Sequence, residues 1–167
     1  MSSMTASTPE PGLCAVFDPD RPTAPLQCLR GVVADSPDGR SRVVLDGALL
    51  NAFSLASELC ASGSPLLPQR PAEILLALYA RLGLDCVQKL RGPFAFVAWD
   101  DRRLFVTRDR LGVHPLYYAR IGRRLAFATR IKDLLAAGVE ARIDPDGLRH
   151  FLLGVRAREA TLFAGIR

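Results

Sequence analysis

The chain has few of the residues that build metal sites or disulfide frameworks. Its 167 residues include four cysteines and two histidines. The cysteines lie far apart and form no Cys-x-x-Cys pair; they are Cys14, Cys28, Cys60 and Cys86. Zinc sites and disulfide scaffolds use closely spaced or paired cysteines. We therefore expect neither a metal site nor a structural disulfide in this chain.

Long apolar segments are also missing. No stretch approaches the roughly 20 apolar residues that a membrane-spanning helix needs. Residues 1–11 are rich in Ser, Thr and Pro and lack the apolar core of a signal peptide. The sequence therefore predicts a flexible leader over residues 1–11, no membrane partner, and a cytoplasmic protein.

The basic residues are not gathered into a stripe. The net charge is +5, and 20 of the 22 basic residues are arginines scattered one or two at a time. Nucleic-acid-binding domains usually concentrate such charge on one face or helix, so we expect no nucleic-acid partner. The hydrophobic content of 49% is typical of a globular chain of this length with a sizeable core. One domain over residues 12–167 is predicted.

The segment 92–130 has the strongest strand pattern in the chain. Short apolar runs alternate with polar turns, as in a series of antiparallel strands. The expected strands cover residues 94–99, 104–107, 113–120 and 125–129. Together they predict a β-meander that is too apolar to face water on both sides.

The remainder of the chain predicts a mixture of strands and helices. Further strands are expected at 12–17, 31–34 and 42–45, with a polar link at 21–30. Helical spacing, turn residues and caps predict helices at 53–61, 72–82, 131–137 and 145–153, with a helical turn within 84–91. The fold class is therefore α+β.

Three motifs follow one another in this chain and carry a family resemblance. They are Gly-x-Phe-Ala-Phe-x-x-Trp-Asp from residue 92, Arg-Asp-x-Leu-Gly-x-x-Pro-Leu-Tyr-Tyr from residue 108, and Phe-Ala-Thr-x-Ile-Lys-x-Leu-Leu from residue 127. Together they resemble the glutaminase-type domain of the asparagine synthetase family, the class II glutamine amidotransferases. The resemblance extends more loosely over residues 12–167. It implies a four-layer αββα sandwich of the N-terminal-nucleophile hydrolase type, with two antiparallel sheets and a shortened N-terminal region.

In that family the nucleophile is an N-terminal cysteine whose own α-amine serves as the base. Placing the family pattern on Gly12 puts Pro11, which has no thiol, at the nucleophile's position. Cys14 could replace it if the leader were removed. However, an odd shift along a strand moves a side chain to the opposite face. The sequence therefore favours Cys14 as a packed apolar thiol over Cys14 as a nucleophile.

The resemblance also identifies a degenerate substrate site. The family has an Asn-Gly oxyanion hole where this chain has Asp46 and Gly47, and a carboxylate offers no hydrogen to a developing oxyanion. Losing one such donor costs roughly 2.7–4 kcal/mol of transition-state stabilisation. Pro71 stands where the family has an Asp that binds the α-amine of glutamine. Arg30 could occupy part of the space of the missing carboxylate-binding segment, although an exposed, solvated arginine is the favoured interpretation. A plain turn is the alternative interpretation of Asp46 and Gly47.

Two further polar residues of segment 92–130 are weaker candidates. His114 has no acidic or Ser neighbour in the sequence, so a catalytic role is not favoured. Asp109 lies between two arginines at a turn and is expected to fix that turn rather than to act as a general base.

These substitutions predict a glutaminase-inactive domain of an ATP-dependent, amide-forming enzyme. The implied parent is closest in character to β-lactam synthetases and lasso-peptide cyclases, with a macrolactam cyclase as the leading hypothesis. The resemblance implies an asparagine-synthetase-like ATP-binding domain as partner, with ATP and magnesium bound there and no cofactor in this domain. A precursor peptide is a second candidate partner. Two alternatives stay open: an active glutaminase domain that uses Cys14 after leader removal, and a freestanding peptide- or partner-binding module.

Overall fold

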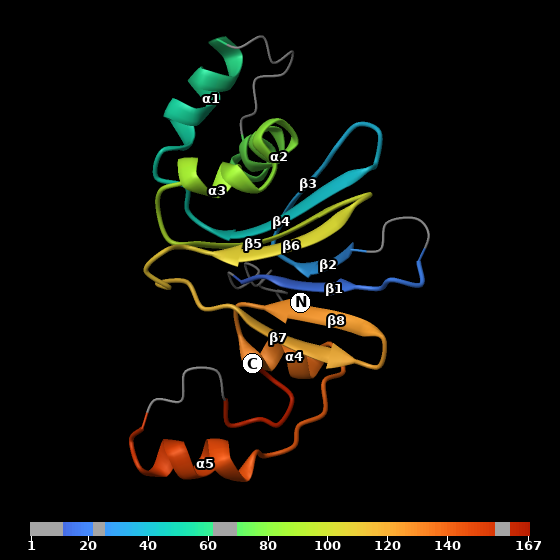
Figure 1. The fold of residues 1–167 in the computed structure, drawn as a ribbon, viewed down its shortest axis with the longest axis vertical. Coiled ribbons are helices and arrows are strands. Elements are labelled where there is room, and N and C mark those ends of the chain that lie inside the picture. The colour runs from blue at the N-terminus through green and yellow to red at the C-terminus, as the bar shows by residue number, and fades with distance from the viewer. Residues whose placement is uncertain (1–11, 22–25, 62–69, 156–160) are drawn as a thin grey trace, which may run out of the picture.

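Two four-stranded antiparallel sheets form the centre of the computed structural model, which describes residues 12–21, 26–61, 70–155 and 161–167 (Figure 1). The first sheet has the order β2-β1-β8-β7, with β1 at Cys14–Phe17, β2 at Leu26–Arg30, β7 at Tyr117–Ile121 and β8 at Arg124–Ala128. The second has the order β3-β4-β5-β6, with β3 at Val32–Asp35, β4 at Ser41–Gly47, β5 at Phe94–Asp100 and β6 at Arg103–Arg108.

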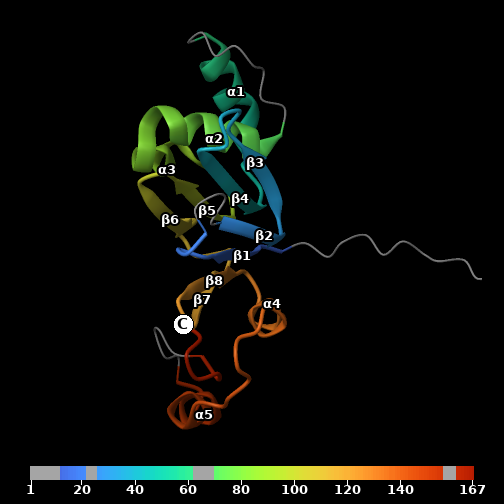
Figure 2. The ribbon, with the colours of Figure 1, turned by 90° about the vertical axis from the view of Figure 1, so that its right-hand side faces the viewer.

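Helices cover the outer faces of both sheets. The β3-β4-β5-β6 sheet lies under α1 (Ala52–Ala61), α2 (Pro71–Leu82), the 3-10 turn η1 (Gly83–Asp85) and α3 (Cys86–Lys89). The other sheet packs against α4 (Ile131–Ala136), and α5 (Pro145–Leu152) lies beyond it at the end of the molecule (Figure 2). The four layers confirm the expected αββα sandwich and the α+β class.

Three clusters of buried side chains hold the layers together. The cluster between the two sheets includes Leu13, Val44, Val97 and Phe127. A larger cluster joins the β3-β4-β5-β6 sheet to α1, α2 and α3, and a smaller one joins the β2-β1-β8-β7 sheet to α4. Burial of apolar surface on both faces of both sheets is what stabilises this stacking.

The predicted four-strand meander is wrong, because its two hairpins belong to different sheets. β5 and β6 pair in one sheet, while β7 and β8 pair in the other. The connection over residues 109–116 crosses between them. The backbone N–H groups of Leu111, Val113 and His114 donate to the Asp109 carboxylate over 3.1, 3.0 and 2.8 Å. Since Val113 and His114 bond Asp109 rather than a neighbouring strand, β7 starts at Tyr117.

The segment expected to be a polar link contains an edge strand. Residues 26–30 form β2, whose Cys28 pairs with Ala15 of β1. As the outermost strand of its sheet, β2 can carry polar side chains such as Gln27 without losing its pairing on the inner side. The cap of α5 was predicted correctly: the Asp144 carboxylate accepts from the N–H of Asp146 over 3.1 Å at the start of that helix.

Candidate functional site

The site predicted from the sequence is centred on the end of β4, where Asp46 and Gly47 lie. Gly47 has φ of 102°, and a Cβ there would collide with the Pro93 carbonyl and lie 2.9 Å from Phe94 Cα. Only glycine allows this close crossing of β4 and the start of β5. Asp46 is two residues beyond Val44 in the strand, so its side chain shares the inter-sheet face with Val44.

The Asp46 carboxylate is occupied by two side-chain partners. Its Oδ2 accepts a hydrogen bond from the Thr129 hydroxyl over 2.8 Å and lies 2.9 Å from His114 Nε2. The Asp46 side chain is 12% exposed and that of His114 is 25% exposed. Since a carboxylate oxygen accepts hydrogen bonds, an imidazole that carries its proton on Nε2 donates to Asp46 in this contact.

Thr129 extends this arrangement to the beginning of the described chain. Its hydroxyl accepts from the N–H of Leu13 over 2.8 Å, and its own N–H donates to the Leu13 carbonyl over 3.0 Å. We call His114, Asp46, Thr129 and Leu13 the Asp46 network. It joins β4, the 109–116 connection and the residues that flank β8 and β1, so it ties the two sheets together.

Sequence reasoning missed the acidic partner of His114. Asp46 lies 68 residues earlier in the chain, and no local pattern connects the two. The expectation that Asp109 fixes a turn agrees with its three backbone donors. Burial would raise the pKa of Asp109, but the hydrogen bonds from His114, Val113 and Leu111 outweigh burial and lower that pKa from its usual range.

Cys14 faces the other side of its sheet. Its side chain is buried at 3% exposure with Val16 and Leu134, in the cluster under α4. The thiol lies 3.6 Å from the carbonyl oxygen of Asp133. Burial, followed by the negative charge of Asp133, raises the pKa of the Cys14 thiol to about 11. At neutral pH this sulfur is a thiol, which is a weak nucleophile.

Two arginines lie beside Gly12, the first residue that the structure describes. Arg130 donates to both carboxylate oxygens of Asp133, over 2.9 and 3.3 Å, and Arg30 Nε is 3.8 Å from Asp133 Oδ1. A Cβ on Gly12 would lie 3.0 Å from Arg30 Cδ and 3.2 Å from Arg130 Nε. Arg30 is thus in an ionic cluster beside the first described residue, while Pro11 falls outside the described residues.

Pro71 is the first residue of α2 and is exposed. Its ring has no group that could bind an amine. The helix start is stabilised instead by Glu73, whose carboxylate accepts from the Arg70 guanidinium over 2.7 Å and from the Arg70 N–H over 3.3 Å. The residues that sequence reasoning grouped as one substrate site therefore lie on separate elements, with Asp46 and Gly47 on β4 and Pro71 on α2.

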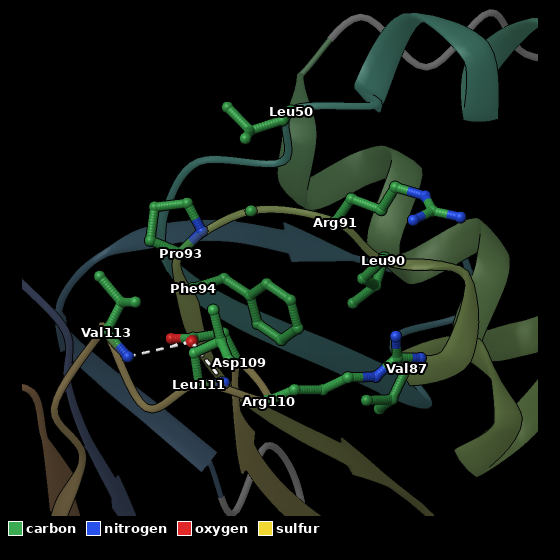
Figure 3. A pocket seen from close by; sticks show the side chains of 11 residues that line it. Leu50, Val87, Leu90, Arg91, Pro93, Phe94, Asp109, Arg110, Leu111 and Val113 are labelled. Atoms are coloured by element: carbon green, nitrogen blue, oxygen red, sulfur yellow. Dashed lines mark hydrogen bonds between the residues drawn. The ribbon is translucent and has the colours of Figure 1, made fainter.

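A cavity of about 370 Å³ lies between α3, the start of β5 and the loop after β6 (Figure 3). Its lining is mainly apolar and includes Leu50, Val87, Leu90, Phe94, Leu111 and Val113. Asp109, Arg91 and Arg110 contribute the charged side chains. Sequence reasoning did not identify this cavity, because its walls come from segments up to 63 residues apart, the distance from Leu50 to Val113.

The described ranges contain neither a metal-binding cluster nor a membrane-spanning helix. No group of three or more His, Cys, Asp or Glu side chains there is placed to hold a metal ion. None of the helices in those ranges combines the length and apolar character needed to cross a bilayer.

Known proteins similar to this chain include amidotransferase domains. The family described as glutamine amidotransferase domain matches residues 33–167. The glutamine-hydrolyzing asparagine synthetase 3 of Bacillus subtilis (strain 168) is 39% identical over 130 residues, which are 75% of this chain and 21% of that protein. A putative glutamine-hydrolyzing asparagine synthetase of Mycobacterium tuberculosis (strain H37Rv) is 34% identical over 160 residues, which are 84% of this chain and 24% of that protein. This chain thus spans about a quarter or less of these relatives.

The fold also occurs in solved structures. The glutamine phosphoribosylpyrophosphate amidotransferase of Bacillus subtilis matches with a TM-score of 0.55 and 22% identity, over 65% of this chain and 26% of that one. At this identity the likeness is one of fold. It agrees with the two stacked antiparallel sheets described above.

Proposed function

This chain belongs to the glutamine amidotransferase domain family, and from that membership we propose that it is a domain of an ATP-dependent, amide-forming enzyme in which the glutaminase reaction has been lost. In this proposal the domain supports a synthetase domain, or the peptide substrate of that domain, and does not itself release ammonia. The parent enzyme uses ATP and magnesium at a site in the synthetase domain.

The occupied carboxylate of Asp46 carries this proposal. Hydrolysis of a carboxamide develops negative charge on oxygen, and amidotransferases of this kind need hydrogen-bond donors around it. At the corresponding position this chain has an acceptor, Asp46, and the Thr129 hydroxyl and the His114 ring are both directed at that acceptor. An oxyanion placed there would meet a negative charge in place of a donor.

The environment of Cys14 supports the same proposal. A nucleophilic thiol must reach its substrate as a thiolate. Cys14 lies in an apolar cluster against α4, with a pKa raised to about 11, whereas Asp46 faces the space between the sheets. The Cys14 thiol therefore cannot attack a carbonyl held beside Asp46 unless β1 repacks.

A peptide macrolactam cyclase is the parent enzyme that we propose. Such an enzyme activates a carboxylate with ATP as an acyl-adenylate and releases pyrophosphate. An amine of the same substrate then attacks the acyl carbon, and AMP and a proton leave as the amide forms. Since the attacking nitrogen belongs to the substrate, no ammonia is required and the glutaminase chemistry can be lost. The asparagine synthetases similar to this chain are named as glutamine-hydrolyzing, so the proposal predicts a measurable difference from them.

A glutaminase assay tests the proposal directly. We expect the purified chain to release glutamate from glutamine no faster than a heat-treated sample does. This should hold at glutamine concentrations up to roughly millimolar values, which is the upper range of enzyme KM values. Intact-mass analysis of the same preparation shows whether Cys14 has become the N-terminal residue. Glutamate release that disappears in a Cys14→Ala variant would overturn the proposal in favour of a working glutaminase.

A further inference from the structure

The apolar cavity beside α3 is bordered by side chains that the fold leaves exposed. Leu90 and Phe94 form its floor and are 4% and 2% exposed. At the rim, Leu111 is 89% exposed, Leu50 is 77% exposed and Val113 is 64% exposed. Isolated apolar residues on a surface are ordinary, but three around one apolar cavity are a feature of binding sites.

Hydrogen bonds hold this rim in place. The three backbone donors to Asp109 fix the loop that carries Leu111 and Val113. The N–H of Asp109 also donates to the Phe94 carbonyl over 2.8 Å, which ties the loop to the cavity floor. A rim that is ordered before binding loses little conformational entropy when a ligand arrives.

The charge around the cavity is positive. Arg91 and Arg110 line it, and neither forms an ion pair with another residue that the structure describes; Arg110 donates to the Gln88 carbonyl over 3.2 Å. Asp109 is the acidic residue of the lining, and its carboxylate is already bonded to backbone N–H groups. Figure 3 shows both arginine side chains extending to the same side of the cavity, away from Val113.

We propose that this cavity binds an extended peptide segment that inserts one bulky apolar side chain and carries an acidic residue next to it. The apolar side chain would contact the floor and the three rim residues, and the carboxylate would pair with the arginines. The inference rests on the peptide-supporting role in the proposed function and gives that role a location. A concave apolar slot with cations on one side fits a side chain followed by a charged neighbour, as in other anchor pockets for peptides.

The test measures binding of a fluorescein-labelled heptapeptide, Gly-Ser-Gly-Leu-Glu-Gly-Ser, to the full chain by fluorescence anisotropy. Replacing the peptide's Leu with Ala should weaken binding about tenfold, because alanine buries less apolar surface in the cavity; tenfold corresponds to about 1.4 kcal/mol. Leu111→Ser should weaken binding severalfold. Leu152→Ser is the matched control: Leu152 is 73% exposed on α5, far from the cavity, and its replacement should leave binding unchanged.

A double-mutant cycle tests the charged part of the proposal. In this cycle the peptide's Glu is replaced with Gln, and the chain carries Arg91→Gln or Arg110→Gln. The effects of the peptide change and the protein change on the Kd should be coupled by about two- to fivefold, and this coupling should shrink as salt is added. Arg102→Gln, in the exposed turn after β5, is the control for loss of positive charge and should show no coupling.

Several results would overturn the inference. These are no binding at millimolar peptide, equal binding of the Ala peptide, equal losses in Leu111→Ser and Leu152→Ser, or binding to phosphatidylserine vesicles without binding to the peptide. The glutaminase assay on the same preparation separates the two proposals. A chain that releases glutamate yet binds the peptide contradicts only the loss of glutaminase activity, and a chain that does neither contradicts only the peptide site.

Discussion

The 109–116 connection contributes residues to both the Asp46 network and the apolar cavity, but the side chains of the two regions differ in whether they already have partners. In the network, a carboxylate, a hydroxyl and an imidazole satisfy one another between the sheets. At the cavity, large apolar side chains and two arginines without ion pairs to described residues face outward. Groups that already have partners stabilise the fold, whereas exposed apolar groups around a cavity are available to a ligand.

Asp46 and Asp109 differ in the kind of donor that their carboxylates accept from. Asp46 accepts from side chains, and Asp109 accepts from three backbone N–H groups. The last of these donors is His114, whose ring contacts Asp46, so Asp109 orders the loop that serves both regions. Removing Asp109 should therefore damage both regions. Changes at other residues should affect either the stability of the network or binding at the cavity, but not both.

The largest effect is expected for Asp109→Ala. This change leaves three backbone donors without their acceptor, and each hydrogen bond to a charged group contributes about 1.5–3 kcal/mol. Water can reach the exposed side of the loop, so we expect a loss of about 3 kcal/mol in the free energy of unfolding, measured by urea denaturation. Peptide binding at the cavity should disappear as well. Asp109→Asn, which keeps one acceptor oxygen, should lose about half as much stability.

Acid titration provides an independent control for Asp109. The pKa of Asp109 is lower in the folded chain than in the unfolded chain, where it is about 3.9. The ionised carboxylate therefore stabilises the fold at any pH above the unfolded pKa. This stabilisation is lost as the pH falls through the lower, folded pKa. The difference in unfolding free energy between the unmodified chain and Asp109→Asn should therefore shrink below about pH 4. A difference that stays constant between neutral and acidic pH would contradict this role.

An intermediate effect is expected for Thr129→Val. The valine cannot accept from the buried N–H of Leu13, and Asp46 loses one of its two partners. An unpaired buried donor costs about 1–3 kcal/mol, so we expect a loss of about 2 kcal/mol in the free energy of unfolding. Thr129→Ser keeps the hydroxyl and should lose far less. Peptide binding should be unchanged in both variants, and a parallel loss of binding would show that the network and the cavity are not separable.

The sequence predicted local structure well where the determining residues are neighbours. The β5-β6 hairpin was expected because a polar turn separates two apolar runs, and in the structure the Asp100 carboxylate accepts from the N–H groups of Arg102 and Arg103. The cap of α5 by Asp144 is equally local. The role of Asp109 could be anticipated too, since its donors lie two to five residues later.

Features that depend on distant partners were not predicted. β2 exists because it pairs with β1, and its polar side chains at a sheet edge look like a link in the sequence. The division of the meander depends on which sheet each hairpin joins. The contact between His114 and Asp46 spans 68 residues, so the sequence marked Asp46 as a lost donor but gave no sign of its partner. Apolar rim residues such as Leu111 likewise looked like ordinary loop residues.

The smallest effect on stability is expected for Leu111→Ser, and this is the sharpest test of the comparison. Leu111 is 89% exposed, so the folded chain gains almost no apolar burial from its side chain. Exposed substitutions usually change the free energy of unfolding by less than about 0.5 kcal/mol, and we expect a change within that range by urea denaturation. The same variant should lose peptide binding severalfold, in contrast to Thr129→Val, which should lose stability and keep binding. If Leu111→Ser instead destabilised the chain by as much as Thr129→Val, the rim leucine would be a structural contact, and its exposure would no longer indicate a docking site.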